Sequence, residues 1–399
     1  MKWKFYSLAF VAGMSILTAC SSDDNNDNDG NGGNGNGNEI ENGTILKGTI
    51  TSDVTLAAGN TYKLSGEYIV EEGATLHIEE GVKIIAVYDD IADYILVKQG
   101  GKINAVGTPD KPIVMTSEKE EPGAWGGIHI CGRAHTNAEG GKGSSEIGGA
   151  VYGGNDDADN SGTLQYIRLE YTGFAFDEEH EANGISFYGV GNGTIVDHCQ
   201  AYKGSDDGFE FFGGSVNVSN LVAVSCSDDS FDWTEGWNGK GTNLVAYQED
   251  KSTLGYDCDC LMECDNNGSN NAATPVAHPV LKNLILVGNG GSKQGIRLRA
   301  GTEVEIDNAK VCGKGQPLTV ETALTENALK NGTSKLTNIT LTSELSSKEG
   351  IYTHADFIAV TSNKVDANLS YSSFEDIRKE CSWMSGSWVK YKKEAPPRL

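Results

Sequence analysis

Acidic residues recur at a nearly constant spacing in the middle of the sequence. The pairs Asp206-Asp207 and Asp228-Asp229 each precede a short segment in which apolar and polar residues alternate. Those segments, Gly208-Phe209-Glu210-Phe211 and Ser230-Phe231-Asp232-Trp233, place a further acid between two aromatic residues. Clustered carboxylates of this kind can ligate a hard cation, or can act as acid and base in glycoside hydrolysis.

The alternation predicts short strands in which the residue between the two apolar positions faces outward. Adjacent strands lie about 4.8 Å apart, so residues at equivalent positions form a row. In chain order the predicted row contains Ser186, Glu210, Asp232, then Asp259 of Cys258-Asp259-Cys260, and Arg297 of Ile296-Arg297-Leu298. Stacked like charges are unfavourable unless a cation lies among them or some acids stay protonated.

Three interpretations of these acids remain open. In the first, the Asp pairs cap turns and the row is a solvated sheet face. In the second, the acids bind Ca²⁺, with Asp206, Asp207, Asp228 and Asp229 as metal ligands. In the third, they act on a polysaccharide, and the catalytic candidates are Asp207, Asp229, Glu210 and Arg297.

Aromatic residues accompany the acids, as a sugar-binding site requires. Trp233 alternates inward and is predicted to lie in the core. Trp237 lies in the Gly-rich segment 235–239 and is predicted to form an exposed platform. The predicted ligand-binding residues are Glu210, Asp232, Asp259 and Trp237.

A second set of segments can be aligned on one position, which is asparagine in all but the first of them. The aligned residues are His198, Asn220, Asn243, Asn283, Asn308 and Asn338. Stacked asparagine amides can bond one another as a ladder. Repeats of 22 to 25 residues with short strands favour a parallel β-helix over a β-sandwich or a leucine-rich repeat.

The segments 74–85, 96–103 and 125–130, with Gly107-Thr108-Pro109 and Pro112-Ile113, resemble the right-handed parallel β-helix lipoproteins, which are distant in sequence from pectate lyases. The resemblance covers residues 45–313 and implies an all-β, single-stranded right-handed parallel β-helix.

Polygalacturonases share this architecture and carry an Asp-Asp pair, a Gly-His-Gly segment and an Arg-Ile-Lys segment. Asp206-Asp207 and Arg297-Leu298-Arg299 can be aligned with the first and last of these. The next coil, however, has Asp228-Asp229-Ser230 and no histidine. The resemblance therefore transfers no catalytic residue.

The N-terminus resembles a bacterial lipoprotein signal. Lys2 and Lys4 precede an apolar stretch that ends in Leu17-Thr18-Ala19-Cys20. This pattern predicts a signal peptide over residues 1–19 and lipidation of Cys20. Residues 20–44 are predicted to form a disordered spacer, whose acidic start resembles the surface-export signal of Bacteroidetes lipoproteins.

Residues 314–399 are predicted to form further coils and a C-terminal cap. Pro317 to Asn331 has helical spacing, and Trp383 and Trp388 are expected to close the open end of the solenoid. A disulfide is expected among Cys258, Cys260, Cys264 and Cys312, since lipid-anchored export allows oxidation.

The net charge and the predicted membrane anchoring together indicate the function. Removal of residues 1–19 leaves a formal charge of 29 minus 56, or −27, which excludes nucleic acid as the main partner. We expect an outer-membrane, lipid-anchored protein that faces the cell exterior and binds or displays towards extracellular glycan, with Ca²⁺ as cofactor. The alternatives are a polysaccharide lyase or glycoside hydrolase acting on acidic polysaccharide, and a structural or adhesive surface protein.

Overall fold

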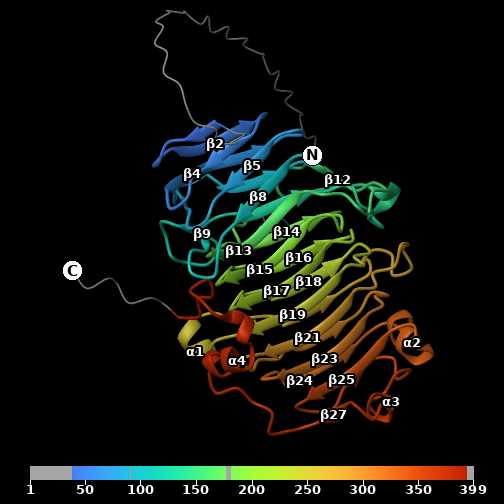
Figure 1. The fold of residues 1–399 in the computed structure, drawn as a ribbon. Coiled ribbons are helices and arrows are strands. Elements are labelled where there is room, and N and C mark those ends of the chain that lie inside the picture. The colour runs from blue at the N-terminus through green and yellow to red at the C-terminus, as the bar shows by residue number, and fades with distance from the viewer. Residues whose placement is uncertain (1–37, 90, 177–180, 393–399) are drawn as a thin grey trace, which may run out of the picture. The chain divides into compact units, whose positions relative to one another are not determined.

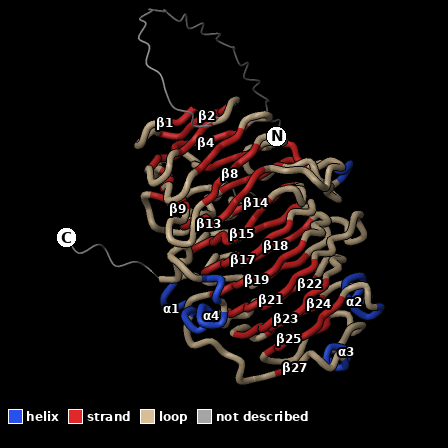
Figure 2. Tube along the Cα trace, viewed as in Figure 1, coloured by secondary structure: helices blue, strands red, loops and turns tan. Residues whose placement is uncertain are grey.

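Parallel strands make up most of the computed structural model, which describes residues 38–89, 91–176 and 181–392. From β1 (Asn38–Ile40) to β27 (Lys364–Val365), the strands stack coil upon coil (Figures 1 and 2). The predicted right-handed parallel β-helix is confirmed. The predictions for the signal peptide, for Cys20 and for residues 20–37 lie outside the described residues.

One ladder carries the acidic row. It contains β14 (Ile185–Tyr188), β16 (Phe209–Phe212), β18 (Phe231–Thr234), β20 (Met262–Cys264) and β22 (Gln294–Leu298), each in parallel register with the next. Phe187 and Phe211 from this ladder stack inside the solenoid at 5.1 Å between ring centroids. Trp233 is 1% exposed, as predicted for a core residue. Inward aromatic residues therefore hold the strands whose outward neighbours are acidic.

The longer strands bend at the predicted asparagine position. They include β15 (Ile195–Tyr202), β17 (Asn217–Val224), β19 (Lys240–Tyr247), β21 (Val280–Val287), β23 (Glu305–Cys312) and β25 (Lys335–Leu341). Asn220, Asn243 and Asn283 have φ of 56°, 60° and 60°, in the left-handed region that asparagine tolerates. Asn243 Nδ2 donates to Asn220 Oδ1 at 2.8 Å, and Asn283 Nδ2 donates to Asn243 Oδ1 at 3.0 Å. The predicted asparagine ladder is confirmed from Asn220 to Asn308, whereas Asn338 Nδ2 donates to Asp307 Oδ1 at 2.6 Å.

The same coils continue beyond residue 313. β24 (Gln316–Val320) pairs with β22, so Pro317 to Val320 are strand rather than the predicted helix. The helix α2 (Ala323–Asn331) begins later and ends at Gly332, whose φ is 86°. Phe357 of α3 (His354–Ala359) is fully buried in the interior core. An aromatic side chain of α3, rather than Trp383 or Trp388, is therefore inserted at the C-terminal end of the solenoid.

The predicted tryptophan lid is wrong. After β27 the chain turns back along the outside of the coils, through α4 (Phe374–Glu380), as far as Pro109 (Figure 1). We call residues 366–392 the C-terminal strap. Trp388 of the strap is fully buried, with its ring 5.3 Å from His198. The outward faces of the longer strands carry apolar residues such as Val222 and Val245, and burying these residues against the strap excludes water from both.

No helix in the described part of the chain is long and apolar enough to cross a membrane.

Candidate ligand-binding site on the acidic face

The predicted row exists, with one change of member. Strand pairing puts Glu210 opposite Asp232, Asp232 opposite Glu263, and Glu263 opposite Arg297. Ser186 occupies the rung before Glu210. Asp259 does not lie in this row, because the strand is Met262–Cys264 and not Cys258-Asp259-Cys260. Met262 and Cys264 are the inward residues there, which turns Glu263 outward.

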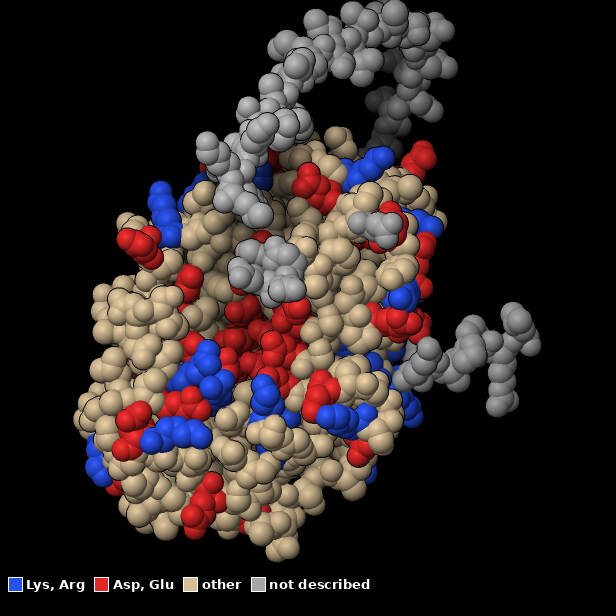
Figure 3. All heavy atoms as spheres, turned by 180° about the vertical axis from the view of Figure 1, so that it is seen from behind, with Lys and Arg blue, Asp and Glu red and all other residues tan. Residues whose placement is uncertain are grey.

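Two more acidic rows come from the turns that enter these strands. Three coils repeat one spacing, in which two turn residues are followed three positions later by the outward strand residue. In the first acidic coil these are Asp206, Asp207 and Glu210; in the second Asp228, Asp229 and Asp232; in the third Asp259, Cys260 and Glu263. We call these eight acids and Cys260 the acidic face. Figure 3 shows acidic side chains gathered in a hollow of the surface.

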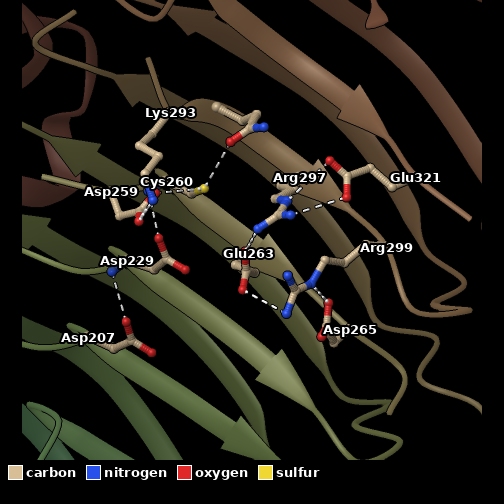
Figure 4. Close-up of polar contacts among 11 residues, drawn as sticks. Asp207, Asp229, Asp259, Cys260, Glu263, Asp265, Lys293, Arg297, Arg299 and Glu321 are labelled. Carbon is tan, nitrogen blue, oxygen red and sulfur yellow. Dashed lines mark hydrogen bonds and ion pairs between the residues drawn. The ribbon is translucent and has the colours of Figure 1, made fainter. Parts of the chain in front are cut away.

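The middle row links successive coils through the backbone. Asp229 N–H donates to Asp207 Oδ1 at 2.8 Å, and Cys260 N–H donates to Asp229 Oδ1 at 2.6 Å (Figure 4). The turn-capping interpretation therefore accounts for one oxygen of Asp207 and one of Asp229. It does not account for the acids of the other two rows.

Burial makes the first two coils electrostatically costly. Asp207 and Asp229 are 5% and 4% exposed, and loss of water, followed by neighbouring carboxylates, raises their pKa well above the usual value. Loss of water, and then the charge of Asp228, raises the pKa of Asp206 to about 7. The pKa of Asp228 rises to about 6 for the same first cause, helped by Asp259.

Glu210 and Asp232 behave in the same way. Burial and then neighbouring acids raise the pKa of both carboxyls well above the usual value. Among residues 38–89, 91–176 and 181–392, no Lys, Arg or His forms an ion pair with any of the six acids of the first two coils. Near neutral pH these raised pKa values favour protonated carboxyls or a bound cation in these coils.

The third coil differs, because basic residues of the next coil neutralise it. Arg297 Nη1 donates to Glu263 Oε1 at 2.7 Å, and Arg299 Nη2 lies 3.2 Å from Glu263 Oε2. Lys293 pairs with Asp259 (Figure 4). Lys293 and Arg297 occupy the positions that Asp206 and Glu210 occupy three coils earlier.

Arg297 also contacts Glu321, through Nη2 at 3.2 Å. Its guanidinium is therefore shared between two carboxylates. This arrangement gives Arg297 a neutralising role in the fold and leaves it poorly placed as a catalytic base or as a partner for a uronate.

Three groups of carboxylates offer oxygen atoms close enough to share one cation. Their ligand atoms lie within 4.8 Å of one another, and the groups are Asp206, Asp207 and Asp228; Asp207, Glu210 and Asp232; and Asp229, Asp232 and Glu263. Asp232 Oδ1 and Asn183 Oδ1 are both buried without a hydrogen-bond partner. The Nδ2 atom of Asn183 donates to Glu210 Oε2 at 2.6 Å. Oxygen ligands of this density suit Ca²⁺. The residues present therefore fit a calcium ion.

The prediction that Trp237 forms an exposed platform is wrong. Trp237 is 1% exposed and stacks on Phe211 at 4.1 Å between ring centroids. Its Nε1–H donates to Val216 O at 3.1 Å. The glycine-rich turn folds the indole inward, where burial of a large ring and a satisfied N–H favour it.

The expected disulfide is also absent, since all eight described cysteines are free. Cys264 lies in the interior core, whereas Cys312 lies on the outer face under the strap. Cys260 Sγ lies 3.4 Å from Asp259 Oδ1, to which it donates. Cys264 and Cys312 therefore lie in separate environments and cannot meet the short distance that a disulfide requires.

Sequence reasoning missed the contributions of Asn183, Lys293 and Arg299. Asn183 stands three positions before Ser186, and Lys293 stands four positions before Arg297, so both follow the turn and strand spacing of the acidic coils. Applying this spacing to every coil would have identified these two residues, and would have replaced Asp259 by Glu263 in the strand row.

Comparison with known proteins agrees with this architecture. The chain matches none of the curated proteins. Among solved structures, the Dettilon tailspike protein (gp208) is similar at 9% identity and a TM-score of 0.27, over 73% of this chain and 57% of the tailspike chain. The chain thus spans less than two thirds of that protein, and the similarity is too low to inform function. The profile described as "Pectate-lyase like beta helix domain" matches residues 48–390, and the chain therefore belongs to this family.

Proposed function

We propose that the protein is a lipid-anchored surface protein whose acidic face binds Ca²⁺ and, through it, an acidic extracellular polysaccharide. The observation that carries the proposal is the set of six carboxylates on the first two acidic coils, which no described cationic side chain pairs. A cation held by several carboxylates keeps positive charge for a further oxygen ligand, such as a uronate of a polysaccharide.

Binding is favoured over catalysis by the state of the basic residues. Arg297 and Arg299 are committed to Glu263, Asp265 and Glu321. A lyase needs a basic group free to remove a proton, and these two arginines are not free to do so.

Calcium binding is tested by isothermal titration of the full-length chain. We expect saturable binding that the double variant Asp206→Asn/Asp228→Asn weakens at least tenfold. Glu344→Gln is the matched control, because Glu344 is an exposed acid outside the acidic face. Unchanged affinity in the double variant, or no binding to the wild-type chain, would remove calcium from the proposal.

Polysaccharide binding is tested with polygalacturonate as the probe, with and without Ca²⁺. We expect retention of the polymer only with Ca²⁺ present and only by chains with an intact acidic face. Release of unsaturated or new reducing ends would instead support a lyase or a hydrolase.

Anchoring is tested separately through Cys20, which the sequence predicts to carry the lipid. We expect Cys20→Ala to move the protein from the membrane fraction to the soluble fraction. Protease treatment of intact cells then reports whether the β-helix faces the exterior.

A further inference from the structure

A cavity away from the acidic face combines an aromatic ring with a row of amides. It lies where the C-terminal strap passes the asparagine ladder and has a volume of about 230 Å³. Its lining includes Asn243, Asn283, Asn308 and Trp383. Trp383 belongs to the short helix η2 (Ser382–Met384) of the strap. Two segments far apart in the sequence therefore build this cavity.

The amides retain hydrogen-bonding capacity after the ladder is made. Asn283 Nδ2 donates to Asn243 Oδ1 at 3.0 Å, and Asn308 Nδ2 donates to Asn283 Oδ1 at 2.8 Å. A primary amide has two N–H groups and two oxygen lone pairs, so Asn283 keeps one of each beyond the ladder. Asn283 and Asn308 are exposed, which leaves this capacity open to a ligand.

The indole beside them is held in place but is not covered. Trp383 is half-buried, with its ring centroid 6.2 Å from that of His198 and 6.2 Å from that of Trp388. A ring fixed in this way can stack on a ligand without a large loss of side-chain entropy.

The cavity is neutral as well as polar. Its two charged residues, Lys310 and Glu380, pair with each other. An ionic ligand would have to compete with this pair, whereas a ligand with hydroxyl groups and an apolar face would meet matched partners. The volume is smaller than the roughly 300 to 1,000 Å³ of typical drug-sized sites, which indicates a ligand of about one sugar ring.

We propose that this cavity, formed by Trp383 and the amides of Asn243, Asn283 and Asn308, binds an uncharged sugar unit of a glycan. The left-handed backbone explains why asparagine occurs at these positions, but it requires neither an adjacent cavity nor an uncovered indole. The site goes beyond the proposed function, because it is separate from the acidic face and needs no cation.

The test is isothermal titration of the full-length chain with cellohexaose, laminarihexaose and mannohexaose as neutral probes. We expect saturable binding of at least one probe, unchanged by a calcium chelator. Trp383→Ala should weaken this binding at least tenfold. Ser382→Trp should also weaken it at least tenfold, because Ser382 is an exposed lining residue and a larger side chain there fills the cavity.

Ser382→Trp keeps the test informative if Trp383→Ala fails to fold, since it removes no packing contact of Trp383 or Trp388. The control Asp206→Asn/Asp228→Asn should bind the neutral probe as the wild-type chain does. No binding of any of the three probes, or full binding by Ser382→Trp, would overturn the proposal. Loss of binding in the acidic-face variant alone would also overturn it, by placing the sugar on the acidic face. Failure of calcium binding would leave this result unaffected.

Discussion

The first two acidic coils and the fourth coil carry residues of opposite charge at equivalent positions. Asp206 and Glu210, with Asp228 and Asp232 one coil on, form no ion pair with a described cationic side chain. Lys293 and Arg297 occupy the equivalent positions of the fourth coil and neutralise the third. Basic side chains thus neutralise stacked acids in this fold, but they do so one coil beyond the six acids that form no ion pair with a described cationic side chain.

The two regions therefore differ in how their charges affect the stability of the folded state. Stacked carboxylates without a counter-charge destabilise the folded state, so their retention needs a benefit outside stability. On the function proposed above, a bound cation would supply such a benefit, because it is both counter-charge and ligand.

The largest expected effect is on the pH dependence of stability. Without divalent cations, the acids of the first two coils should make folding less favourable as the pH rises from about 4 to about 7. The pKa of Asp206 is raised to about 7 and that of Asp228 to about 6, so the folded chain holds more protons than the unfolded chain in this window. The stability that they contribute is complete below pH about 4 and is lost as each acid ionises, by about 1.4 kcal/mol per pH unit per extra proton.

Urea unfolding in a chelator at several pH values measures this effect. Asp197 and Asp356 have a pKa lowered to about 2 and oppose it, so the quantity to compare is the difference between the wild-type chain and Asp206→Asn/Asp228→Asn. A difference that stays constant with pH would contradict the charge assignment.

The next largest effect on stability is expected from the third acidic coil, which basic residues neutralise. Arg297→Gln leaves Glu263 and Glu321 facing each other without the shared guanidinium, and should lower the free energy of unfolding by about 3 kcal/mol. Chemical denaturation at pH 7 measures this loss. Arg297→Lys, which keeps the charge but loses the planar fork, should recover part of it. A loss below about 0.5 kcal/mol in the glutamine variant would show that the ion pairs are solvated.

Calcium should act on the other side of the comparison. At a concentration one hundred times its Kd, Ca²⁺ should stabilise the chain by about 2.7 kcal/mol, because it binds the folded state alone. Asp206→Asn/Asp228→Asn should lose most of this gain, and Glu344→Gln should keep it. Thermal unfolding with and without Ca²⁺ makes the comparison. An equal gain in all three chains would place the ion elsewhere.

The smallest effect is the most discriminating, because its sign changes between the two regions. In a chelator at pH 7, Asp232→Asn should raise the free energy of unfolding by about 1 kcal/mol, since a neutral amide avoids the cost of ionising a buried acid among like charges. Glu263→Gln should lower it by about 1 kcal/mol, since it removes a partner of Arg297 and Arg299. Effects of the same sign in both variants would end the distinction between the coils.

Most of the fold could be predicted from local patterns in the sequence. The repeat length and the alternation in segments such as Gly208-Phe209-Glu210-Phe211 determine a solenoid, since every coil must bury its inward residues against the next. The asparagine position could be read from sequence for a similar reason, because it recurs in successive coils, whereas its left-handed backbone emerged only from the structure. Glu210 and Asp232 share a row for the same cause.

The failures lie where one local pattern allows two placements. Cys258-Asp259-Cys260 and Met262-Glu263-Cys264 both alternate, and only strand pairing selects the second. Trp237 follows a glycine-rich turn that could lead the indole outward or inward, and packing on Phe211 decides for inward. Trp388 could close an end or cover a face, and the apolar outer face of the longer strands decides for the face.

The sequence by itself determined that acids recur once per coil on a parallel β-helix, because a period and an alternation are local properties of the chain. Only the tertiary structure decided which of these acids are neutralised. Arg297 reaches Glu263 across 34 residues of chain, and Lys293 reaches Asp259 across the same separation. Compensation between charges depends on distances across coils, and those distances exist only once the coils are stacked.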